Sequence, residues 1–124
     1  MLSMVTAHHY SAAHDSTLNK AYVEAFRKAN NFRPNFISVG GYDGMHVIYE
    51  ALKKTGGNTD GGALIAAMKG MSWESPRGRI AIDAETRDIV QPIYIRKVER
   101  IAGELYNSEF ETFDAVKDPM KISR

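Results

Sequence analysis

The spacing of apolar residues changes at Trp73, and this change limits the folds that the chain can adopt. Before Trp73 the apolar residues recur every three or four positions, as in Leu18, Tyr22 and Phe26, which is typical of amphipathic helices. After Trp73 they alternate with other residues, as in residues 79–83, which is typical of half-buried strands. A chain with both periods in separate stretches is predicted to be an α/β protein.

Three helices are predicted in the first part, each with a polar cap residue before it and asparagine or glycine after it. Between the first two, residues 36–39 form a short apolar run closed by Gly40 and Gly41, which predicts a buried strand. Asp43 is then expected in the first turn of the second helix, where the helix dipole stabilises an acidic side chain. From cap to stop, the predicted helices span residues 15–31, 42–57 and 59–70.

The second part of the chain is predicted to be a run of strands. Strands are expected over residues 79–83 and 93–98, with a turn over residues 84–87 between them. Residues 101–104 are expected to form a hairpin loop. Residues 114–124 show no apolar period, so a tail is expected there.

The charge and the cysteine content exclude several classes of function. Sixteen Lys and Arg residues against fifteen Asp and Glu residues leave a formal net charge of +1, so nucleic acid is not expected as a partner. The chain has no cysteine, which excludes disulfides, thiolate zinc sites and cysteine catalysis. No apolar run approaches the roughly 20 residues that cross a bilayer. The 124 residues suffice for one compact domain.

The cluster of His8, His9 and His14 with Asp15 is the one group that resembles a metal or acid–base site. Imidazoles at these positions could converge on a divalent ion, with the carboxylate as an outer partner. The spacing matches no regular zinc pattern, however. A loop that leads into a capped helix is therefore the preferred interpretation, and the metal site is kept as an alternative.

Two further segments carry residues that could bind an anion. Residues 40–44 form a glycine-rich segment that is expected to be a tight strand-to-helix turn with positive φ angles, and they match no nucleotide-binding pattern. Residues 75–79 hold Arg77 and Arg79 beside a proline. Arginine is a good ligand for carboxylates, but a solvated turn is the preferred interpretation of this segment.

Four stretches, in this order, resemble the C-terminal third of a type 1 periplasmic binding protein, of the branched-chain amino acid or amide type. They are Val5 to Asn19 with the following Lys-Ala-Tyr-Val, Gly41-Tyr42-Asp43-Gly44 with residues 48–57, residues 63–68, and residues 75–83 with residues 92–98. The Tyr-Asp-Gly of this chain replaces the Tyr-Asp-Ala of many members. The resemblance covers about 110 residues.

The resemblance implies a part of a two-lobe α/β fold, with helices on a mostly parallel sheet followed by C-terminal strands. Residues about 16–85 would belong to the lobe that holds the N-terminus of the intact protein, and residues about 90–115 to the other lobe. Residues 6–10 and 86–90 would be hinge crossings. The chain is thus expected to be a piece of a longer protein that has lost its signal peptide, and its exposed edges are expected to make it self-associate.

The implied function is that of the substrate-binding component of an ABC transporter. Such a protein captures a small amino acid, amide or aromatic carboxylate in the periplasm and delivers it to a permease, without catalysis or a cofactor. Because a strand-to-helix turn in an α/β lobe faces the crevice, the site is expected at Gly41, Tyr42 and Asp43, with His9 and Tyr10 on its rim. The alternatives are a ligand-sensing regulator on the same fold, or a small metal-dependent hydrolase that uses the histidine cluster.

Overall fold

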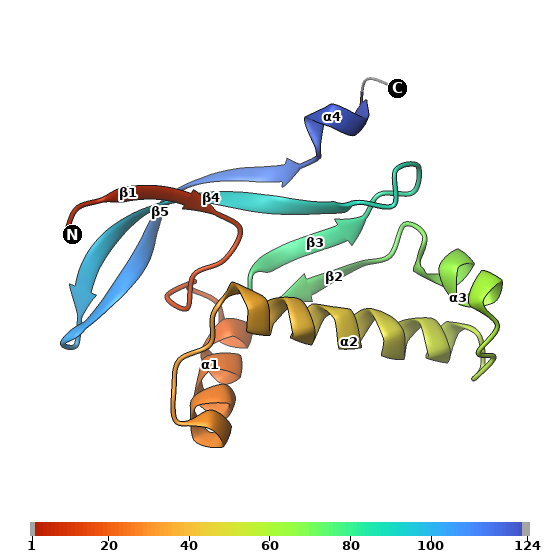
Figure 1. Cartoon of the computed structure of the whole chain (residues 1–124), viewed down its shortest axis with the longest axis horizontal. Helices are drawn as coiled ribbons and strands as arrows, with labels where there is room; N and C mark the ends of the chain where they lie inside the picture. The colour runs from red at the N-terminus through yellow and green to blue at the C-terminus, as the bar shows by residue number, and fades with distance from the viewer. Residues whose placement is uncertain (1, 123–124) are drawn as a thin grey trace.

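The computed structural model describes residues 2–122 and places a five-stranded sheet beside a group of helices (Figure 1). The α/β class expected from the two periods is confirmed. The elements in chain order are β1 (Val5–His8), α1 (Thr17–Asn30), α2 (Phe36–Lys54), α3 (Gly61–Met68), β2 (Ser72–Ser75), β3 (Gly78–Ile82), β4 (Ile89–Ile101), β5 (Glu104–Val116) and α4 (Pro119–Ile122).

The long strand β4 holds the sheet together. Its first residues pair with β3, and the rest pairs with β1 and with β5. The β4–β5 register shifts between Gln91 and Ile93 and between Ile95 and Arg96. Every pairing among the described residues is antiparallel, so the expectation of a mostly parallel sheet is wrong. The reason is that β2 to β5 follow one another through short turns, which can join only antiparallel neighbours.

The first helix forms where it was predicted. Ser16 is its N-cap, and the Ser16 hydroxyl accepts a hydrogen bond from the Asn19 N–H at 3.0 Å. The helix ends at Asn31, whose φ of 61° is the left-handed conformation of a helix stop. The third predicted helix is confirmed as α3, with Asp60 as its N-cap. The strands predicted at residues 79–83 and 93–98 are confirmed as β3 and as part of β4.

The strand predicted at residues 36–39 is wrong, because these residues are the first turn of α2. Asn35 and Ser38 form a capping box: the Asn35 side chain accepts from the Ser38 N–H at 3.1 Å, and the Ser38 hydroxyl accepts from the Asn35 N–H at 2.9 Å. With this cap, α2 begins at Phe36, six residues before Tyr42, where the glycine-rich segment had predicted the helix to begin. Asp43 therefore lies in the middle of α2, not in its first turn.

The core lies between α2, α3 and the β2–β3 hairpin. Its buried members are Ala51 of α2, Met71, Trp73 of β2 and Ile80 of β3. The partly buried residues that pack around them are Val47, Leu64, Ala67, Met68, Ile82 and Ile89. Trp73, where the apolar period changes, thus lies where the helices meet the hairpin.

The tail expected from residue 114 is also wrong in part, because β5 continues to Val116 and α4 follows it. Two lysines of this segment form ion pairs with aspartates in the connection between β3 and β4. Lys117 Nζ lies 2.7 Å from Asp83 Oδ2, and Lys121 Nζ lies 2.8 Å from Asp88 Oδ2. Among residues 2–122, no helix has both the length and the hydropathy to cross a membrane.

Candidate functional site

The loop that follows β1 has a shape fixed by one buried asparagine of α1. Asn19 is 1% exposed, and its Oδ1 accepts from the Tyr10 hydroxyl at 3.1 Å. Its Nδ2 donates to the carbonyls of Ala12 and His14 at 3.2 and 2.9 Å. Because a buried amide with all these partners is expensive to displace, the loop is held rigidly against the start of α1. Burial also raises the pKa of the Tyr10 hydroxyl.

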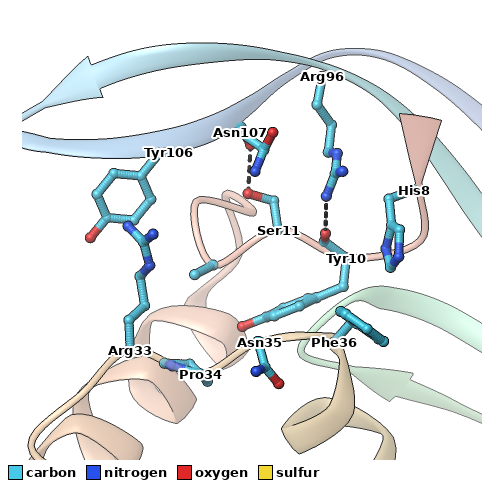
Figure 2. A pocket seen from close by; sticks show the side chains of 11 residues that line it. His8, Tyr10, Ser11, Arg33, Pro34, Asn35, Phe36, Arg96, Tyr106 and Asn107 are labelled. Carbon is cyan, nitrogen blue, oxygen red and sulfur yellow. Dashed lines mark hydrogen bonds between the residues drawn. The ribbon is translucent and has the colours of Figure 1, made fainter. Parts of the chain in front are cut away.

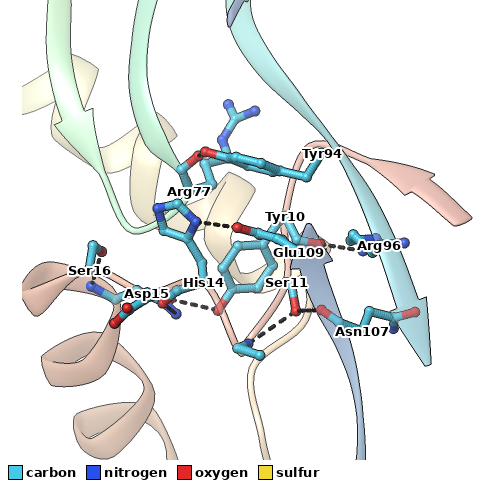
Figure 3. A network of polar contacts seen from close by, with 12 residues as sticks. Tyr10, Ser11, His14, Asp15, Ser16, Arg77, Tyr94, Arg96, Asn107 and Glu109 are labelled. Carbon is cyan, nitrogen blue, oxygen red and sulfur yellow. Dashed lines mark hydrogen bonds and ion pairs between the residues drawn. The ribbon is translucent and has the colours of Figure 1, made fainter. Parts of the chain in front are cut away.

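The same loop is hydrogen-bonded to β4 and β5, which are distant from it in sequence (Figure 3). The Arg96 guanidinium on β4 donates through Nη1 to the Tyr10 carbonyl at 2.5 Å. The Ser11 hydroxyl donates to the Asn107 carbonyl on β5 at 2.5 Å. Segments about 90 residues apart in sequence therefore meet at one polar junction.

Two histidines and a phenylalanine form an aromatic cluster beside this junction. The ring centroids of His8 and His9 are 4.3 Å apart, and Phe36 at the start of α2 lies 5.1 Å from His8 and 6.3 Å from His9. Burial lowers the pKa of His8, and burial followed by the nearby Arg77 charge lowers the pKa of His9 to about 4. Both imidazoles are therefore neutral at pH 7.

The structure does not bring the histidine cluster together around a metal. His14 turns away and places its Nδ1 2.7 Å from Glu109 Oε2 on β5. Asp15 pairs with Lys20 at 2.6 Å on the exposed surface, and this contact lowers the pKa of Asp15. Within the described chain, no group of three His, Asp or Glu side chains could hold a metal ion.

A cavity of about 440 Å³ opens beside the junction (Figure 2). This volume is within the range of small-molecule sites. Its walls come from the end of β1 and the loop after it, the α1–α2 connection with the start of α2, β4 and β5. They carry two arginines, the His8 imidazole, three further aromatic rings and, among the described residues, no acidic side chain. The lining residues are His8, Tyr10, Ser11, Ala12, Arg33, Pro34, Asn35, Phe36, Arg96, Tyr106 and Asn107.

Asp43 is buried and has a structural set of partners. Its Oδ2 lies 2.7 Å from Arg77 Nε, and its Oδ1 accepts from Trp73 Nε1 at 3.2 Å. Arg77 also donates to the Gln91 side chain. The solvated turn expected around Arg77 is therefore wrong, because this guanidinium is buried against the carboxylate in α2, a residue distant in sequence.

Gly41 and Tyr42 line a separate hollow between α1 and α2. Tyr42 is 37% exposed and packs edge-on against Tyr22 at 5.3 Å, and the hollow of about 470 Å³ continues along α2 to Tyr49. Neither Gly41 nor Gly44 has a positive φ, so the tight turn expected for residues 40–44 is wrong. The turn was expected because three glycines lie within five residues, but all of them fit in the helix.

Of the five residues predicted for the site, Tyr10 lies at the junction and lines the cavity, whereas His9 packs against His8 beside the junction and is not part of the lining. Gly41 and Tyr42 lie at the second hollow, and Asp43 lies in the core. The sequence reasoning missed Arg96 and Phe36. A signal for Arg96 was present, because it stands two residues after Tyr94 on the inward face of a strand, where a charged residue is unusual.

Over most of its length the chain is similar to the proteins of one family. Residues 1–104 match the family model described as Periplasmic binding protein. The Leu/Ile/Val-binding protein homolog 6 of Brucella abortus (strain 2308) is 47% identical over 121 residues, which are 95% of this chain and 31% of that protein. The chain thus spans about a third of the length of the curated relatives that it matches.

Two solved structures match closely in shape. A solute-binding protein of an ABC transporter from Rhodopseudomonas palustris BisB5, in complex with 3,4-dihydroxybenzoic acid, is 68% identical with a TM-score of 0.96, over 97% of this chain and 33% of that chain. A second, from R. palustris HaA2 in complex with p-hydroxybenzoic acid, is 40% identical with a TM-score of 0.91, over 99% of this chain and 34% of that one.

Proposed function

Because the chain belongs to the periplasmic binding protein family, we propose that it contributes part of the ligand-binding cleft of a transport protein that captures a small aromatic carboxylate. The family and its structural relatives are binding proteins, and those relatives serve ABC transporters. A location in the periplasm and delivery of the ligand to a membrane permease belong to the same proposal. The protein would act by capture and release, without a chemical step.

The cavity beside the polar junction carries this proposal. Its arginines supply positive charge, its aromatic rings supply flat apolar walls, and no acidic group lines it within the described residues. An aromatic ring with a carboxylate at one end needs this combination of walls, since the ring is stabilised by burial and the carboxylate by guanidinium groups. The ligands bound to the two similar R. palustris proteins have this chemistry.

A branched-chain amino acid is the second candidate ligand, because the curated relatives are called Leu/Ile/Val-binding homologues. An amino acid is a zwitterion, and a carboxylate in the cleft would be the strongest partner for its ammonium group. No carboxylate among the described lining residues offers that partner. The aromatic carboxylate is therefore the preferred ligand. A carboxylate in the part of the cleft outside this chain would favour the amino acid instead.

The division of the chain between two lobes is part of the proposal. The α1, α2 and α3 helices with the β2–β3 hairpin, within residues 16–85, would belong to one lobe. The parts of β4 and β5 within residues 90–115 would belong to the other lobe. The pairing of β4 supports this division, because its start pairs with β3 and its later part with β1 and β5. Residues 6–10 and 86–90 would then be the crossings between lobes.

The isolated chain is proposed to self-associate. Its solvent-accessible surface of 8009 Å² exceeds the roughly 6,600 Å² expected of a compact monomer of 13.8 kDa. Large apolar side chains of α2 and the segment before it are exposed, which favours association. They are Phe32, Phe36, Ile37, Tyr42, Met45, Ile48 and Tyr49. Sedimentation velocity at rising concentration tests this, and a monomer throughout would contradict it.

Isothermal titration of the full-length protein with 4-hydroxybenzoate, 3,4-dihydroxybenzoate and leucine tests the ligand class. Binding of the aromatic acids and a much weaker response to leucine are expected. The variants His9→Ala, Tyr10→Phe and Phe36→Ala probe the junction, and Tyr42→Ala with Gly41→Ala probes the second hollow. Weaker binding only in the second pair would move the site to α2, and no response to any of the three compounds would refute the proposed function.

A further inference from the structure

We propose that a latch of four side chains holds the tip of the β4–β5 hairpin against α1, and so keeps the two walls of the cavity at the spacing that binds a ligand. The latch consists of Arg27, Arg33, Glu104 and Tyr106. This inference rests on the proposed function, because it concerns the cavity assigned to the ligand. It adds a set of positioning residues that control affinity through the shape of the cavity.

The tip of the hairpin has no third strand beside it. On one edge of β4, β3 pairs with residues 89–90, and the segment of β1 bonds no further along β4 than Val98. Beyond Val98, residues 99–101 pair with residues 104–106 alone. A hairpin of two strands is at best marginally stable by itself. Contacts from outside the sheet therefore decide where the tip lies.

Tyr106 on β5 is the centre of the latch. Its hydroxyl donates to Glu104 Oε2 at 3.1 Å and accepts from Arg27 Nη2 of α1 at 3.2 Å. Arg27 Nη2 also lies 2.5 Å from the same carboxylate oxygen, and this bond, followed by that of Tyr106, lowers the pKa of Glu104. The two charged side chains are 41% and 54% exposed, so their ion pair alone would contribute little. Its effect depends on the shared tyrosine.

The ring of the same tyrosine contacts a second arginine, at one end of the cavity. The Arg33 guanidinium carbon lies 4.2 Å from the centre of the Tyr106 ring, a cation–π contact, and Arg33 Nη1 donates to the Leu105 carbonyl at 2.8 Å. Arg33 and Tyr106 line the cavity from opposite walls, the α1–α2 connection and β5 (Figure 2). Pro34 restricts the backbone of the residue before it, so Arg33 reaches across from a stiff segment.

The latch and a ligand should stabilise each other. In the proposed division of the chain, α1 and the α1–α2 connection belong to one lobe and β5 to the other. A ligand that contacts both walls and a latch that joins them favour the same spacing, so loss of either weakens the other. This coupling acts through the position of the hairpin, so it does not depend on the charge of the ligand.

The test compares 4-hydroxybenzoate with its neutral amide, 4-hydroxybenzamide, by isothermal titration of the full-length protein. Glu104→Gln is expected to weaken binding of both compounds equally, by about two- to fivefold. The direction is informative, because removal of a negative charge beside the cavity would tighten binding of the acid if only the local potential mattered. Tyr106→Phe, which keeps the ring, should cause a similar loss. Glu111→Gln removes the same charge from an exposed position of β5 outside the latch, and should leave both affinities unchanged.

Two results would overturn the latch while leaving the proposed function intact. Unchanged or tighter binding of the acid by Glu104→Gln would show that the ion pair does not hold the cavity in shape. A loss confined to the acid in Tyr106→Phe would show that the cluster acts on the ligand charge and not on the hairpin.

Hydrogen exchange tests the latch without any ligand. In the full-length protein, the amides of residues 99–106 should exchange at least about threefold faster in Glu104→Gln than in the wild type. Equal exchange rates would overturn the latch. Failure of the wild-type protein to bind either compound would instead refute the proposed aromatic ligand, and the exchange measurement would then decide on the latch alone.

Discussion

Asp43 and Arg77 form a buried ion pair in which Arg77 Nε lies 2.7 Å from Asp43 Oδ2 and both side chains are less than a tenth exposed. The pair joins the middle of α2 to the connection between β2 and β3, with Trp73 as a second donor to the carboxylate. It holds the helix that begins at the candidate site against the hairpin that leads to β4.

Removing one partner of this pair should destabilise the protein strongly. Asp43→Asn is expected to lower the free energy of unfolding by about 3–5 kcal/mol, because Arg77 would be left as an uncompensated buried charge. Urea unfolding at one protein concentration, followed by the fluorescence of Trp73, measures this. Glu74→Gln breaks the exposed pair with Arg79 and should cost less than about 1 kcal/mol. Equal effects of the two variants would contradict the structural role of the buried pair.

Gly78 allows β3 to approach β4 closely. Its φ is +100°, and an added Cβ would lie 2.5 Å from the Tyr94 hydroxyl and 3.2 Å from Pro92 Cγ. Gly78→Ala should therefore cost about 3 kcal/mol or more, from backbone strain and steric overlap together. Gly57→Ala, at φ +87° with open space around it, isolates the strain and should cost about 1 kcal/mol. Gly44→Ala in α2 should stabilise the helix by about 0.5–1 kcal/mol.

The loop beside the cavity should depend on Asn19. Asn19→Ala leaves the Tyr10 hydroxyl and two loop carbonyls without their partner, which should cost about 2–3 kcal/mol of stability. Because these bonds also shape the cavity wall, the full-length variant should bind 4-hydroxybenzoate more weakly. Asn30→Ala, which removes one exposed bond to the Phe26 carbonyl, is the control for both measurements. Tight binding by Asn19→Ala would show that the loop keeps its shape without this residue.

Stability should fall with acid as His9 becomes protonated. The folded-state pKa of about 4 is below the usual value of about 6.5, so the unfolded chain binds the proton more readily. The contribution of His9 is therefore complete above about pH 6.5 and is lost as the pH falls toward 4. Urea unfolding at several pH values should show this decline, and His9→Asn should reduce it without abolishing it, because the pKa of His8 is lowered too. An NMR titration of the His9 ring with a midpoint near 6.5 would contradict the prediction.

The sequence predicted the elements that begin with one clear cap residue, and it failed where two local patterns competed or where a distant contact decided the outcome. Ser16 and Asp60 marked helix starts because a cap acts on the next three residues. Residues 36–39 resembled a strand because an apolar run with β-branched residues fits both structures, and the capping box of Asn35 and Ser38 decided for the helix. Local patterns also gave no sign that the second helix would bury Asp43.

The prediction of the candidate site was limited in the same way by contacts between distant segments. His9 and Tyr10 were predicted for the rim of the site, at a hinge crossing implied by the resemblance, and of the two only Tyr10 lines the cavity. Their neighbours come from β4 and β5, and pairing between strands this far apart in sequence leaves no local signature. The burial of Arg77 depends on its ion pair with Asp43, 34 residues earlier in the sequence. The proline and glycine beside Arg77 predicted a solvated turn instead.

β4 belongs to both halves of the sheet, and this has a mechanical consequence. If β3 rotates relative to β1 and β5, the backbone of β4 must twist between the residues that pair with β3 and the residues that pair with β1 and β5. The two irregularities in its ladder with β5, at residues 91–93 and 95–96, are the places where peptide groups can rotate without losing regular partners. The second of them adjoins Arg96, so any twisting of the strand would move the guanidinium relative to the carbonyl of Tyr10.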